Sequence, residues 1–122
     1  MKLVTDIKEA NNLLQSYVGA TLQIAFYRES LRRMAIRIMR RNVDEIIYLV
    51  GVGCQSISGR FSFSNVNLSI TLDVDKVTNE NLTVISDEAS EFKLITSGGF
   101  ALAQGVESDF GRSFDNFFNE AR

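Results

Sequence analysis

The stretch Ile46-Ile47-Tyr48-Leu49-Val50-Gly51-Val52-Gly53-Cys54 is the longest apolar run of the chain. Both sets of alternating residues in it are apolar, so a strand formed here has no face to turn toward water. Such a strand belongs in the middle of a sheet, with another layer of structure on each face. Gly51 and Gly53 fall on one face, where they let a second element approach closely. We therefore predict a central strand covered on both sides.

Further strands are predicted on either side of this run, because apolar and polar residues alternate there. The alternation is clearest over residues 66–74, which predicts a strand with one buried face. Shorter stretches separated by polar breaks follow the pattern of a meander. The remaining predicted strands begin at Thr21 and cover residues 61–64, 82–86, 92–96 and 100–103.

Residues 30–41 fit two patterns. As a helix they place an apolar stripe opposite a row of arginines; as a strand they point Met34, Ile36 and Ile38 inward. The many Leu, Arg, Met and Ala residues favour a helix. The short connection to the preceding strand and the direct lead into the next one favour a strand, with a hairpin turn near Asn42. We favour the strand.

A helix is predicted at each end. Over residues 6–18 the apolar side chains fall on one face, Asp6 and Glu9 have the spacing of a capping box, and Gly19 follows as a stop. From Ser108 onward a second apolar stripe recurs at helical spacing and makes a candidate partner-docking helix. Its phenylalanines are Phe110, Phe114, Phe117 and Phe118. Burying four phenylalanines is worth roughly 6–12 kcal/mol, so this stripe needs a cover, either from its own sheet or from a neighbouring molecule.

The fold class that follows is α+β. We expect a single domain over residues 1–122, with a mainly antiparallel, meander-like sheet of five to seven strands flanked by an N-terminal and a C-terminal helix. Two short helices leave part of the central strand uncovered, and a second copy of the chain would complete the cover. The sequence therefore predicts a homodimer or a larger homo-oligomer.

Absent residue types exclude several kinds of chemistry. The 122 residues contain no His, no Pro, no Trp and one Cys. Triads that rely on imidazole cannot form, and neither can a zinc site with three or four Cys or His ligands. The lone Cys54 ends an apolar run, which is typical of a small buried hydrophobe. We expect no enzyme activity, no cofactor and no metal site.

Positive charge is concentrated in one short segment. Residues 28–41 hold six of the 13 cations against Glu29 alone, a net charge of +5, whereas residues 42–122 carry −7 and the whole chain −2. Arginine suits bidentate contacts with phosphate or carboxylate. The negative total, with no aromatic side chains between the arginines, favours contact with acidic protein surface over nucleic acid. The candidate interaction surface comprises Arg28, Arg32, Arg33, Arg37, Arg40 and Arg41.

These features favour a non-enzymatic regulatory or adaptor protein that contacts another protein, through a sheet edge or a helix face, and also itself. The alternatives are a nucleic-acid-binding regulator that uses the arginine segment, and a small-molecule binder or enzyme with a sheet-lined pocket whose polar group is Tyr27, Tyr48 or a carboxylate. The N-terminus turns polar at Thr5, and the longest apolar run is half the length of a membrane span. We expect a cytoplasmic protein that contacts no membrane.

Overall fold

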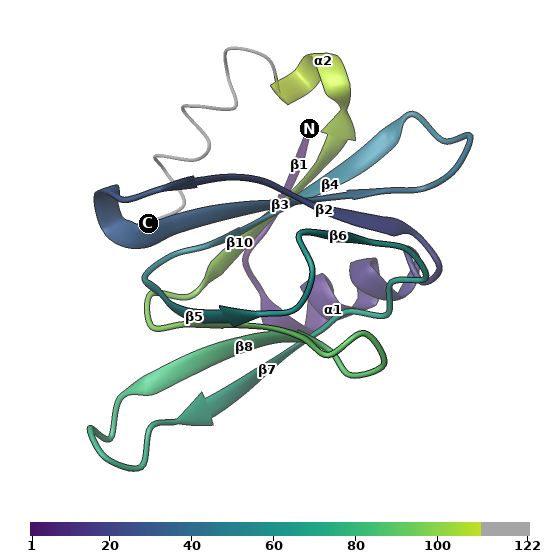
Figure 1. Cartoon of the computed structure of the whole chain (residues 1–122). Coiled ribbons are helices and arrows are strands. Elements are labelled where there is room, and N and C mark those ends of the chain that lie inside the picture. Colours follow the sequence, from purple (N-terminus) through teal and green to yellow (C-terminus); the bar gives the residue numbers. More distant parts are fainter. Residues whose placement is uncertain (111–122) are drawn as a thin grey trace.

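The computed structural model describes residues 1–110, which form ten strands in two antiparallel sheets together with two short helices (Figure 1). The helices are α1 (Ile7–Gln15) and α2 (Glu107–Phe110), and one 3₁₀ turn, η1, spans Ser30–Arg32. The first five strands are β1 (Lys2–Val4), β2 (Thr21–Arg28), β3 (Arg33–Met39), β4 (Glu45–Gly51) and β5 (Cys54–Ser58). The other five are β6 (Ser62–Phe63), β7 (Ser69–Val74), β8 (Asn81–Asp87), β9 (Phe92–Thr96) and β10 (Phe100–Val106).

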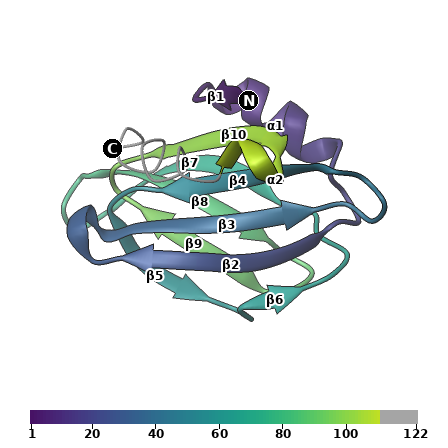
Figure 2. The ribbon, with the colours of Figure 1, turned by 90° about the horizontal axis from the view of Figure 1, so that it is seen from above.

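The two sheets face each other as a sandwich. The larger has the order β1-β10-β4-β3-β2-β6 and the smaller β5-β9-β8-β7. Figure 2, which is seen from above, shows the large sheet in front of the small one. The prediction of mainly antiparallel structure with two short helices is confirmed. The single sheet of five to seven strands is wrong, because the chain turns at Gly53, whose φ of +67° suits glycine, and enters a second sheet at Cys54.

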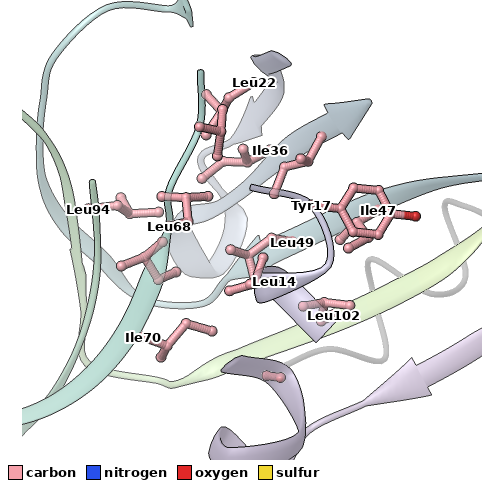
Figure 3. Packing of buried hydrophobic residues seen from close by; sticks show 14 of the residues in the cluster. Leu14, Tyr17, Leu22, Ile36, Ile47, Leu49, Leu68, Ile70, Leu94 and Leu102 are labelled. Carbon is pink, nitrogen blue, oxygen red and sulfur yellow. The ribbon is translucent and has the colours of Figure 1, made fainter. Parts of the chain in front are cut away.

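β4 is the central strand that the apolar run predicts. It pairs with β10 on one edge and β3 on the other, and every residue from Ile46 to Gly51 is buried. Its inner face packs on the second sheet and on α1, in a cluster that joins Ile47 and Leu49 to Leu94 and Leu14 (Figure 3). A Cβ on Gly51 would lie 2.9 Å from the side chain of Thr96, so this glycine permits the close approach of the sheets.

The outer face of the large sheet holds a second apolar cluster. Four of its members are small or β-branched residues that share a face by strand register, namely Ala35, Val50, Ala101 and Ala103. Phe110 of α2 packs against the same cluster, with its ring centroid 4.7 Å from that of Tyr48. Both faces of β4 are therefore covered, as its sequence requires.

α1 lies along one side of the sandwich, not on a sheet face (Figure 2). Asp6 caps the helix by accepting a hydrogen bond from the Glu9 N–H at 2.9 Å. The amide of Asn11 donates to the Ile70 carbonyl at 2.9 Å and accepts from the Ile70 N–H at 2.8 Å. Asn11 thus imitates a neighbouring strand and satisfies the exposed edge of β7 at that position. The predicted flanking position of the helix is therefore corrected to a seal between the two sheets.

Residues 33–39 are strand, as we favoured, and the turn after them contains Asn42 at a φ of +59°. Met34, Ile36 and Ile38 point into the core, and β3 pairs with β2 on one edge and β4 on the other. This burial and pairing outweigh the helix propensity of the segment. The strand predicted over residues 66–74 is shorter, because pairing with β8 begins at Ser69. Its last apolar residues, Leu72 and Val74, project past the core and are exposed.

Replacing Asn11 with alanine should lower the free energy of unfolding by about 1–3 kcal/mol, because two hydrogen bonds to the edge of β7 are lost. Urea unfolding followed by circular dichroism measures the change, and amide exchange at Ile70 should accelerate in parallel. Asn12→Ala is the matched control, since Asn12 is exposed on the same helix and should change stability by less than about 0.5 kcal/mol. Equal effects of the two substitutions would contradict this role of Asn11.

Candidate functional site

The arginine segment does not fold into one surface. The β2–β3 hairpin carries its members to opposite ends of β3 and to the outer sheet face between them. The sequence placed these side chains together only along the chain. Their positions are the end of β2 (Arg28), η1 (Arg32), the start and middle of β3 (Arg33, Arg37), and the residues that follow β3 (Arg40, Arg41).

Three of the arginines are engaged inside the fold. Arg33 is only 4% exposed, and its Nε donates to the Ser30 carbonyl at 3.1 Å. Arg37 forms an ion pair with Glu107 of α2, and so ties the outer face of β3 to the chain beyond β10. Arg40 lies over the ring of Tyr17 with its guanidinium carbon 4.1 Å from the centroid. These side chains support the fold and offer little to a partner.

Arg28 and Arg32 belong to a connection that we call the basic loop, residues 27–32. Leu31 and Arg32 have positive φ values of 58° and 45°, which side chains other than glycine rarely adopt. The Gly53 N–H donates to the Leu31 carbonyl at 3.0 Å, so the β4–β5 turn holds the loop in this shape. Tyr27 and Leu31 are both exposed beside the two arginines. With Glu29 against the two arginines the loop carries a net charge of +1, and it presents this charge together with apolar side chains.

The β7–β8 turn forms a second projecting element, which we call the acidic hairpin, residues 72–80. Its apolar side chains Leu72, Val74 and Val77 are 71%, 44% and 94% exposed to solvent. Three acidic residues against Lys76 give the segment a net charge of −2. Exposed apolar side chains gathered on a projecting element are typical of an interaction site. Sequence reasoning predicted the two strands but did not identify this hairpin as a candidate site, because regular alternation there predicts a buried face.

The basic loop and the acidic hairpin lie at the same end of the sandwich, which we call the charged end. Met34, just after the loop, pairs with Gly51. Beyond the following turn Cys54 pairs with Thr96, which in turn pairs with Thr83 at the base of the hairpin. In Figure 1 both elements reach out on the left. The ion pairs Lys2–Glu9, Arg37–Glu107 and Arg40–Glu45 lie away from both elements.

A hollow of about 290 Å³ opens between β2–β3 of the large sheet and β5 of the small one. Its lining is mainly apolar and includes Tyr27, Met34, Ile57 and Leu94; its polar members are Gln55 and Ser56. Tyr27, which we considered as the polar group of a sheet-lined pocket, is thus part of one. Tyr48 is not, because it lies on the outer face of the large sheet against Phe110.

Cys54 also lines this hollow. Burial raises the pKa of its thiol to about 11, an effect that the Met34 backbone and the nearby Arg32 only partly oppose. The thiol is neutral at physiological pH, so it is a poor nucleophile and contributes an apolar surface to the lining of the hollow. This agrees with a small buried hydrophobe at the end of an apolar run.

The predicted docking helix is described only in part. Phe110 is buried against Tyr48 at the end of α2, whereas Phe114, Phe117 and Phe118 lie outside the described residues. Within residues 1–110 no group of three Cys, Asp or Glu side chains is placed to hold a metal ion. Neither helix described there is long and apolar enough to cross a membrane. The chain matches no known protein family, no curated protein and no solved structure.

Alkylation of the single thiol should report its raised pKa. At pH 8 N-ethylmaleimide should modify folded protein about a hundredfold more slowly than the urea-unfolded chain, because the thiolate fraction falls tenfold per pH unit below the pKa. The folded pKa lies above the unfolded one, so this group's contribution to stability should be complete below pH 9 and fall as the pH rises toward 11. Mass spectrometry measures the rates, and equal rates for both states would contradict the buried position of Cys54.

Proposed function

We propose that this chain is a non-enzymatic regulatory or adaptor protein that acts through protein–protein contacts and associates with a second copy through its charged end. The observation that carries the proposal is the exposed apolar side chains on the basic loop and on the acidic hairpin. Leu31, Leu72 and Val77 are exposed to water, and covering them with a partner lowers the free energy of the system.

Opposite charges on the two elements favour a symmetric pair. In a two-fold dimer each surface patch meets the same patch of the partner. When one patch carries two oppositely charged elements, each element can face the opposite charge of the partner, which gives two equivalent contacts. The basic loop of one protomer then faces the acidic hairpin of the other. Charge complementarity of this kind guides association and sets the register of an interface, and salt weakens it.

Protein contact is favoured over nucleic acid by the placement of the arginines. A nucleic-acid interface needs several cations along one open surface. Arg33, Arg37 and Arg40 are held by partners within the fold, and the acidic hairpin lies at the same end as Arg28 and Arg32. A phosphate backbone approaching that end meets both signs of charge.

Charge reversal with mixing tests the proposed dimer. Arg28→Glu with Arg32→Glu should dissociate it, and so should Asp73→Lys with Glu80→Lys; Asp75 is left intact because its carboxylate accepts hydrogen bonds from Val77 and Thr78 in the turn. An equimolar mixture of the two double variants should form a heterodimer, since both contacts are then attractive. Sedimentation at about tens of micromolar and low salt measures the association.

Arg60→Glu with Lys93→Glu is the matched control for the arginine variant, because it makes the same change in total charge at exposed positions away from the charged end. This variant should associate as the unchanged protein does. A monomeric unchanged protein would refute self-association. Two double variants that each dissociate but do not recover on mixing would refute the pairing of loop with hairpin.

A further inference from the structure

The hollow between β2 and β5 lies where the sandwich is least closed. On the opposite side α1 fills the gap between the sheets (Figure 2). Here β6 pairs with β2 only at Leu22 and Gln23, and one more backbone bond joins Ile24 to Phe61. The outer edge of β2 beyond Ile24 and the whole outer edge of β5 have no strand neighbour among residues 1–110. Inward-facing side chains are consequently open to solvent at this position.

Both strands that border the hollow are irregular beside it. The register of β2 against β3 shifts between Ile24 and Phe26, and that of β5 against β9 shifts between Cys54 and Ser56. A bulge bends its strand and redirects the side chains around it, and bulges are frequent next to binding sites. Two bulges on facing edges keep the sheets from closing over Tyr27 and Ile57, which remain about half exposed.

We propose that this hollow binds a small molecule with an apolar body and an anionic head, such as a medium-chain or aromatic carboxylate. The apolar lining of Tyr27, Met34, Ile57 and Leu94 would cover the body. The volume of about 290 Å³ equals that of roughly ten water molecules, which suits a body of about ten non-hydrogen atoms. The proposal does not depend on the proposed function.

Positive charge beside the hollow favours an anionic head group on the ligand. Arg32 is exposed at the end of η1 and forms no ion pair among residues 1–110. It is near enough to the hollow to lower the pKa of Cys54 against the effect of burial. Arg28 lies instead over the ring of Phe26 on the outer face of the large sheet, with its guanidinium carbon 5.7 Å from the centroid, so among the described residues Arg32 alone supplies the positive charge here. The carboxylate of Glu80 also lies near, but it accepts a hydrogen bond from Gln55 at 3.4 Å. A guanidinium is well suited to hold a carboxylate by two hydrogen bonds.

Octanoate and 1-octanol are the probes, because they share a chain and differ in the charge of the head. Titration followed by amide chemical shifts should move resonances of residues 27–34 and 54–57 and leave those of β7 in place. Octanoate should bind more tightly than octanol. Arg32→Glu should weaken octanoate binding about three- to tenfold and leave octanol unchanged.

Ile57→Trp fills the hollow from an edge strand and should abolish binding of both probes. Thr71→Trp on the opposite edge strand is its control and should bind as the unchanged protein does. The Arg32 variant keeps the proposal testable if the Ile57 variant does not fold. Absence of shifts in the unchanged protein at millimolar octanoate would overturn the site. Equal loss of octanoate and octanol in Arg32→Glu would overturn the assignment of the head.

Discussion

The burial of β4 on both faces is the constraint on which the rest of the structure depends. Apolar side chains at every position from Ile46 to Val50 cannot face water on either side, so each face needs its own layer. The chain supplies the inner layer by turning at Gly53 and building a second sheet beneath β4. On the outer side Phe110 packs against Tyr48, and Arg37 pairs with Glu107 to fix where α2 begins.

A consequence of two stacked sheets is a pair of long open sides, and the chain treats them differently. On one side α1 fills the gap, and the Asn11 amide occupies the backbone groups of Ile70 that a further strand would use. On the other side bulges near Gln55 and Ile24 hold the edges of β5 and β2 apart. Part of the exposed apolar surface of residues 1–110, including Tyr27, Ile57 and Leu72, lies in the hollow and at the charged end.

Much of the secondary structure follows from local patterns. The limits of β9 agree with its alternation, the helix after Asp6 begins at its predicted cap, and the strand preferred for residues 30–41 is present as β3. The candidate site was harder to predict from the sequence than the secondary structure. The arginine segment is prominent in the sequence, but a hairpin separates its members. Arg33 binds the Ser30 carbonyl within the 3₁₀ turn, and Arg40 lies over Tyr17 in the turn after α1, which is distant in the chain. Leu72 continues a regular alternation yet is exposed, because alternation gives the face of a residue and not the extent of the sheet opposite it.

By itself the sequence determined that this protein is built of antiparallel strands around one doubly buried strand, and that it lacks the groups for imidazole or zinc chemistry. Periodicity and residue type are local properties, so they can be read without coordinates. Only the tertiary structure decided that the strands divide into two sheets, that a helix seals one side and a hollow marks the other, and that basic and acidic elements distant in the chain share one end. Those features depend on which strands pair and where the chain crosses between sheets, and pairing is a long-range choice made by the whole core.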